Sequence, residues 1–304
     1  MNVTVFGVIF IDIKGFPFAK YNRKGRNLGD IRLCSGGVTR NIVENFANSG
    51  ERVTFVTLNE DSPFGADAFG HLKRLGVNLD YSEKVKDNGM GMWMVILNEN
   101  GDVAGEISKM PDISAMRRLV AERGEEIIKN SGDVVFEIDM SEDIAENILG
   151  LCEKYNKRKY TIVGNMSVIL KRRDLVKRTD CFICNEVEIS RLLDENLTML
   201  TPSEMAQRLK SACLDEGYPS LVVTMGENGA AYYDKTNDIC GSCPAKRVEL
   251  VDTTGAGDAF LSGAVMALSR NYPLSQAVKL GTHMAALTIK TENSACPGVI
   301  GAFE

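Results

Sequence analysis

The sequence predicts an α/β protein built on a doubly wound, mostly parallel β-sheet, with a small β-sheet lid beside it. Short apolar runs of strand length alternate with helical patterns over most of the 304 residues. The runs are apolar on both faces, as expected of strands that helices cover on both sides. Two segments, at about 13–35 and 88–106, interrupt this alternation and predict the lid.

Seven apolar runs are expected to form the strands of the main sheet. They lie at residues 3–9, 53–58, 133–138, 160–163, 181–183, 221–224 and 230–233. No positive charge precedes the first run and no cleavage-like segment follows it, so we interpret it as a buried strand and not as a signal peptide. Alternation with helices predicts that the strands form a doubly wound sheet.

Three helices are well defined by their patterns, at residues 38–49, 256–269 and 274–290. The first presents one apolar face, and Gly50 is suited to end it because glycine readily adopts a left-handed conformation.

The two interrupting segments are expected to pair into a small separate sheet. The second is typical of a hairpin, with strands at 91–97 and 102–106 joined by a turn at 98–101. Such a sheet over the strand ends of the main sheet would act as a lid. Its edges and apolar surface predict a homodimer formed through the lid. We interpret the chain, residues 1–304, as a single domain.

Composition excludes several classes of function. Apolar residues make up 44% of the chain and charged residues 25%, which is ordinary for a globular protein. The net charge of -6, without a block of like charge, argues against a nucleic-acid partner. No apolar run approaches the ~20 residues of a membrane span, so no membrane partner is expected. Because the sequence shows no export signal, we expect a cytoplasmic location.

The eight cysteines include two CxxC pairs, Cys181/Cys184 and Cys240/Cys243. Four thiolates could bind zinc. Cys181 and Cys184 lie in a strand-like run, however, where residues three apart point to opposite faces. We therefore expect reduced thiols.

The most informative segment is VDTTGAGDAF at residues 251–260, which follows a strand-like stretch at 246–251 and opens a helix. Gly255 and Gly257 leave the backbone N–H groups open to an anion, and the helix N-terminus adds positive partial charge. A carboxylate beside an anion site is suited to take a proton from a hydroxyl that attacks a phosphoryl group, which is the role expected of Asp258. The alternative is a glycine turn with Asp258 as a helix-terminal charge.

This string resembles the C-terminal signature of the ribokinase-like (PfkB) family of sugar and nucleoside kinases. The resemblance implies that Asp258 is the general base and that ATP and Mg²⁺ are the cofactors. It assigns the anion hole to Gly255, Ala256 and Gly257. It also implies a monovalent cation, K⁺, beside Asp252 and Thr254.

Further motifs follow in the order found in the family, and their roles are implied by that resemblance. The expected acceptor contacts come from Asp12, Gly36, Gly37, Arg40, Asn41 and Asp139. The expected nucleotide contacts come from Asn185, Thr224, Gly226, Gly229 and Asn293. Glu188 of the NxxE motif is expected to hold Mg²⁺ through water. Each motif alone would have a plainer reading as a turn, a loop acid, a helix start or a hairpin.

The segment GGVTRN at 36–41 is similar to the pseudouridine kinases of the family, whereas ribokinases typically read GGKGAN there. The resemblance therefore implies phosphorylation of the 5′-hydroxyl of pseudouridine, with ribose or another nucleoside as the alternative. Arg40 could bind uracil carbonyls, restrain the sugar loop or form a structural ion pair. A non-catalytic nucleoside-binding protein is a remote alternative, since such a protein has no need of Asp258.

Overall fold

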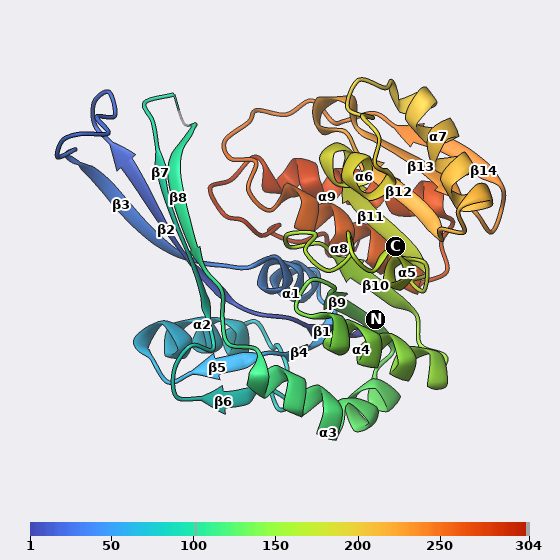
Figure 1. Cartoon of the computed structure of the whole chain (residues 1–304), viewed down its shortest axis with the longest axis horizontal. Coiled ribbons are helices and arrows are strands. Elements are labelled where there is room, and N and C mark those ends of the chain that lie inside the picture. The colour runs from blue at the N-terminus through green and yellow to red at the C-terminus, as the bar shows by residue number, and fades with distance from the viewer. Residues whose placement is uncertain (101, 302–304) are drawn as a thin grey trace.

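The computed structural model describes residues 1–100 and 102–301 and has one large sheet and a separate smaller one (Figure 1). The large sheet has eight strands in the order β14-β13-β12-β11-β10-β9-β1-β4. From β4 to β12 all neighbouring strands are parallel, whereas β13 pairs antiparallel with both β12 and β14. The strands are β1 Asn2–Phe6, β4 Arg52–Val56, β9 Asp133–Glu137, β10 Lys159–Ile162, β11 Cys181–Asn185, β12 Ser220–Thr224, β13 Ala230–Asp234 and β14 Ile239–Cys243.

Helices cover both faces of the large sheet, which confirms the predicted doubly wound architecture. One face carries α1 Val38–Asn48, α2 Pro63–Arg74, α8 Ala256–Ser269 and α9 Leu274–Thr288. The other carries α3 Ser114–Asn130, α4 Glu142–Lys154, α5 Arg173–Val176, α6 Glu186–Leu193 and α7 Pro202–Asp215. Cys181 and Cys184 pack into the cores on opposite faces of β11, as the strand geometry predicts. One metal ion could not bind both.

The stretch at 246–251 is not the strand that the sequence suggests. In the part of the chain that the structure describes, β14 is the last strand of the large sheet and residues 244–250 form no strand. Most of this stretch is exposed, so apolar Leu250 and Val251 are not evidence of a buried strand here. The backbone N–H of Val251 instead donates to the carbonyl of Ile289, just past α9.

The predicted small sheet is present and projects from the main body (Figure 1). We call it the lid sheet. Its strands, in spatial order, are β3 Gly29–Gly36, β2 Phe10–Pro17, β7 Gly91–Leu97 and β8 Val103–Lys109. The predicted lid segment at about 13–35 begins three residues after the start of β2, and Gly101 of the predicted turn lies outside the described residues. A two-stranded sheet, β5 Leu58–Glu60 with β6 Glu83–Val85, and the turn η1 Gly226–Asn228 complete the elements.

The strand order places a ligand crevice at the carboxyl end of β1. The chain runs from β1 to β4 on one side and later returns to β9 on the other, so the order reverses at β1. Ligands of open α/β sheets bind at such switch points. The lid sheet starts at this point, because only three residues separate the end of β1 from the start of β2. Among the described residues, no helix is both long and apolar enough to cross a membrane.

Candidate active site

Two cavities meet at the N-terminus of α8. The first, of about 460 Å³, lies between the lid sheet and the carboxyl ends of β1 and β9, and we call it the lid-sheet cavity. The second, of about 620 Å³, lies between η1, the 244–250 stretch, α8 and α9, and we call it the α8–α9 cavity. Gly257 lines both cavities, and a Cβ placed on it would meet no atom within 4 Å. The backbone of Gly257 is therefore open to a group that lies between the two cavities.

The loop before α8 depends on glycine at one position above all. Gly255 has a φ of 79°, a left-handed conformation, and a Cβ there would collide with the carbonyl of Ser294. Gly255 is also the N-cap of α8, which begins at Ala256. The first N–H groups of a helix have no partner within the helix, so this loop can bind an anion as the sequence predicts.

Asp258, in the first turn of α8, is buried and lines the lid-sheet cavity. Its Oδ2 accepts a hydrogen bond from the Nδ2 of Asn41 at 2.7 Å. The Oδ1 of Asn41 in turn accepts from the hydroxyl of Ser294 at 3.0 Å. Burial raises the pKa of Asp258 to about 7, although the Asn41 hydrogen bond and the charge of Arg40 act in the opposite direction. The carboxyl group is thus suited to exchange a proton near neutral pH.

Arg40 does not line the lid-sheet cavity, which corrects its predicted role as a base contact. Its Nη1 lies 2.7 Å from Glu44, and its other nitrogens donate to the carbonyls of Ser35 and Gly36 and to the Oγ of Ser294. Long side chains on a helix point back towards its N-terminus, and here that direction leads to the glycine pair. Arg40 thus forms an ion pair with Glu44 and hydrogen bonds to the loop before α1, which correspond to its two other predicted roles.

The glycine pair before α1 allows close approach of two chain segments. A Cβ on Gly36 would collide with the carboxylate of Asp12, and Gly37 has a φ of 98°. Asp12, Gly37 and Asn41 all line the lid-sheet cavity, as the sequence predicts. Burial raises the pKa of Asp12, while the nearby charges of Lys14 and Arg40 lower it.

Asp139 supports the cavity from behind, and the structure does not place it among the residues that line it. Its carboxylate accepts from the backbone N–H groups of Gly164 at 3.2 Å, Met166 at 3.0 Å and Val168 at 3.0 Å. Gly164 and its neighbour Asn165 line the cavity. Asp139 therefore shapes the loop at 164–168.

Glu137 is the acidic residue that the sequence reading missed. It ends β9, is buried and lines the lid-sheet cavity. Burial, and then the charges of Asp139 and Asp258, raise its pKa to about 7. A glutamate directly after the apolar residues Val134, Val135 and Phe136 was the available signal, because buried carboxyl groups without a role are rare.

The α8–α9 cavity contains part of the predicted nucleotide set. Thr224, Gly226 and Gly229 line it, and α9 supplies a wall of small and apolar residues. Lys246 and Arg247, which the sequence reading did not single out, add positive charge on the other side.

Three other predicted residues lie outside both cavities. Asn185 and Glu188 form a capping box at the start of α6, in which each side chain accepts from the other residue's backbone N–H. An N-x-x-E spacing is the signature of such a box. Asn293 is exposed in the turn after α9. The structure thus does not bring Asn185 or Asn293 to the α8–α9 cavity.

The two residues predicted to hold a monovalent cation bind each other. The Oδ1 of Asp252 accepts from both the N–H and the hydroxyl of Thr254, each at 2.8 Å. Its Oδ2 lies 3.7 Å from the Nζ of Lys14. Burial opposes ionisation of Asp252, but the bonds from Thr254 and the charge of Lys14 lower its pKa overall.

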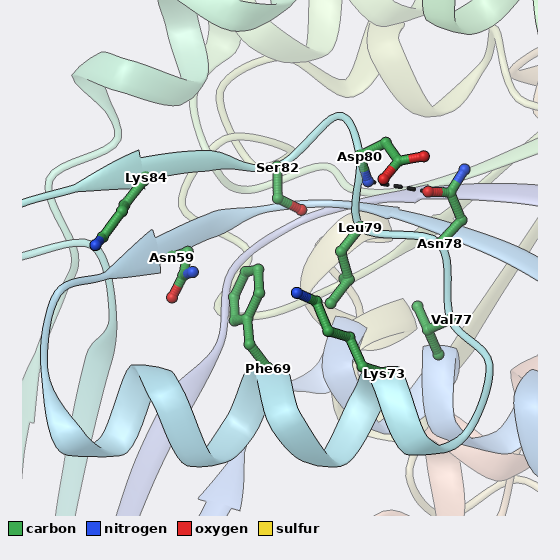
Figure 2. Close-up of a pocket in the computed structure, with 9 residues that line it drawn as sticks. All are labelled: Asn59, Phe69, Lys73, Val77, Asn78, Leu79, Asp80, Ser82 and Lys84. Atoms are coloured by element: carbon green, nitrogen blue, oxygen red, sulfur yellow. Dashed lines mark hydrogen bonds between the residues drawn. The ribbon is translucent and has the colours of Figure 1, made fainter.

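A third hollow, of about 310 Å³, lies between α2 and residues 77–84 (Figure 2). Phe69 and Lys73 line it from α2, and Lys84 lines it from β6. It shares no lining residue with the two cavities above. It is therefore separate from the site around Asp258.

A helix N-terminus between two cavities, with a buried carboxyl group on one side, is the arrangement that a small-molecule kinase requires. The chain matches the family described as "pfkB family carbohydrate kinase" over residues 2–297, and it belongs to that family. This confirms the predicted family and the ribokinase-like fold.

Relatives in this family differ in their acceptors. The chain is 33% identical to the guanosine-inosine kinase of Exiguobacterium acetylicum over 100% of this chain and 99% of that protein. It is 22% identical to the pseudouridine kinase of Escherichia coli (strain K12) over 95% of this chain and 91% of that protein. The structure of Arabidopsis thaliana ribokinase complexed with ribose and ATP superposes with a TM-score of 0.81 at 20% identity, covering 98% of this chain and 95% of that chain. At this level of identity, the structural similarity to ribokinase shows a shared fold only.

Proposed function

We propose that this protein transfers the γ-phosphoryl group of ATP to the 5′-hydroxyl of a nucleoside, with Asp258 as general base. The observation that carries the proposal is the shared lining at Gly257. A nucleotide in the α8–α9 cavity and an acceptor in the lid-sheet cavity would meet at this point. We place this reaction in the cytoplasm as part of the proposal.

In the proposed reaction, the 5′-oxygen attacks the γ-phosphorus, the bond from that phosphorus to the bridging oxygen breaks, and ADP leaves. Asp258 accepts the proton of the attacking hydroxyl. The backbone N–H groups at Gly255 and Gly257 stabilise negative charge on the phosphoryl oxygens as the phosphoryl group passes between the cavities. The N–H of Ala256, which was predicted to share this role, donates to the carbonyl of Thr253 at 3.2 Å and would have to leave it to bind the phosphoryl group. A bound Mg²⁺ would supply charge neutralisation at the phosphates. Glu188 would hold it through water with the carboxylate oxygen that does not cap α6.

The lining of the lid-sheet cavity favours a nucleoside over a free sugar. Asp12, Asn41 and Glu137 offer carboxyl and amide groups that can bind ribose hydroxyls. Phe10, Trp93 and Met110 add apolar surface that a small sugar would leave uncovered. Flat nucleobases stack well on such surfaces.

Among nucleosides, the purine nucleosides guanosine and inosine are the first candidates. The support is the relative named for them, which is 33% identical over the full length. Pseudouridine is the second candidate, supported by the GGVTRN segment and by a relative that is 22% identical.

The test is ADP formation with MgATP and a panel of guanosine, inosine, pseudouridine, uridine and ribose. We expect kcat/KM for the best nucleoside to exceed that for ribose by about tenfold or more, because buried polar groups built for a base lose their partners with ribose. If ribose is the best acceptor, the nucleoside assignment is wrong and the kinase class stands. Binding of a nucleoside without ADP formation would favour the non-catalytic alternative.

A further inference from the structure

Lys14 is a lid-sheet residue whose ammonium group lies against the loop before α8. It follows Asp12 by two positions on β2, so the two side chains share the face that looks onto the lid-sheet cavity. Only 16% of its side chain is exposed. Its Nζ lies 3.7 Å from the Oδ2 of Asp252.

The other oxygen of Asp252 is already saturated. Oδ1 accepts both the N–H and the hydroxyl hydrogen of Thr254. A monovalent cation bound by Asp252 would therefore need Oδ2, where the ammonium group of Lys14 lies.

A second cation does not fit this arrangement. Lysine carries three donors and no acceptor, so it cannot serve as a cation ligand. A potassium ion on Oδ2 would also lie a few ångströms from a largely buried positive charge, where like charges repel strongly. The residues present thus disagree with the K⁺ site that the family resemblance implies.

We propose that the Lys14 ammonium takes the place of the monovalent cation, so that the enzyme works without potassium. The positive charge holds Asp252, Asp252 holds Thr254, and Thr254 sets the conformation of the loop that leads into Gly255 and Gly257. The kinetic part of this proposal rests on the proposed function. The structural part does not, because it concerns only which cation lies at Asp252.

The central variant is Lys14→Met, and Arg32→Met is its matched control. Arg32 is the cross-strand partner of Lys14 on β3. It also joins the lid sheet to the chain after α9, through an ion pair with Glu292 at 3.2 Å, but it is 54% exposed and its acidic partners are Glu292 and Asp30, not Asp252. The control thus removes a lid-to-body ion pair without touching the loop.

Two readouts are compared in KCl and in choline chloride at equal ionic strength: ADP formation with the best acceptor, and Tm. Wild type and Arg32→Met should differ by less than about twofold in rate between the salts, with no difference in Tm. Lys14→Met should lose about tenfold or more in choline chloride, on the scale of losing part of an anion hole. KCl should restore much of that rate and raise the Tm of this variant alone.

The proposal is wrong if KCl activates the wild type by about tenfold or more. It is also wrong if the Tm of the wild type is higher in KCl than in choline chloride. Equal behaviour of Lys14→Met and wild type in both salts would likewise overturn it. If Lys14→Met does not fold, Lys14→Arg keeps the test open, because it should remain independent of KCl. Wild type that forms no ADP in either salt contradicts the proposed function instead, and the Tm comparison still decides the role of Lys14.

Discussion

At the scale of single residues, Glu137 and Asp258 are the two buried carboxyl groups that face the lid-sheet cavity. Burial raises the pKa of each to about 7. Neither group forms an ion pair with another of the described residues, and Asp258 is held by the neutral amide of Asn41. Both therefore favour the protonated form more than an exposed acid does.

Glu137→Gln should alter the pH dependence of stability. The folded-state pKa of about 7 lies above the ordinary value of 4.5. The protonated side chain thus favours the folded state fully below about pH 4.5, and this advantage is lost as the pH rises through 7. Glutamine does not ionise, so the variant lacks this pH dependence. The free energy of unfolding of the variant minus that of wild type should therefore rise by on the order of 1 kcal/mol or more when the pH is raised from 5 to 8. Urea unfolding of both proteins at pH 5 and at pH 8 measures this change. The same difference between variant and wild type at the two pH values would contradict the prediction.

Arg40 is predicted to position the base without touching the acceptor. Arg40→Met removes the donors to the glycine pair and to Ser294, which orients Asn41 against Asp258. We expect kcat to fall by about tenfold, the scale of losing hydrogen bonds to a charged group. The acidic limb of the pH–rate profile should also move upwards, because the charge of Arg40 lowers the pKa of Asp258.

Arg123→Met, on the exposed face of α3, is the control for Arg40→Met and should leave both quantities unchanged. A fall in kcat with no movement of the acidic limb would show that Arg40 acts on folding alone and not on Asp258.

At the scale of elements, the lid sheet has two different faces. Asp12, Trp93 and Ser108 are paired across its strands and line the lid-sheet cavity. The next row across the sheet, Leu33, Ile13, Met94 and Ile107, points the other way. Three of these four apolar side chains are exposed, the exception being Ile13. The alternation along β2 and β7 thus gives one face to the acceptor and leaves an apolar face open.

We expect this open apolar face to pair with a second copy of the chain. Light scattering should give twice the mass of one chain at micromolar concentration, since exposed apolar patches of this kind favour association. Ile107→Glu, in the middle of the face, should give a monomer, whereas Arg123→Glu on the exposed face of α3 should not. A monomeric wild type would remove the dimer from the account and leave the site unaffected.

At the scale of the whole molecule, the main sheet was predictable because its strands are apolar on both faces and its turns are marked by glycine. The runs at 133–138 and 230–233 lie within a residue of β9 and β13. The 246–251 stretch was misread because its apolar residues line a cavity wall and do not pair with a strand. Local pattern does not distinguish these cases.

The site was predictable where chemistry follows from a local motif and not where it depends on distant contacts. Gly255, Gly257 and Asp258 occupy one turn, so their sequence alone implies an anion site. The bond from Arg40 to Ser294 and the bonds of Asp139 to residues 164–168 join segments that are distant in the sequence, so local pattern does not reveal them. Lys14 meets Asp252 across 238 positions of sequence (252 − 14), a contact that only the fold reveals.

The proposed activity depends on Asp258 as the general base between the two cavities. The most direct measurement compares turnover and ATP binding for wild type and Asp258→Asn, with exposed Asp61→Asn as the control. The asparagine keeps the shape of the side chain but cannot take a proton, so kcat should fall by about 10²–10⁴-fold while the Kd for ATP stays nearly constant. Asp258→Asn that retains more than about a tenth of the wild-type kcat would contradict the account, because general-base catalysis contributes more than that.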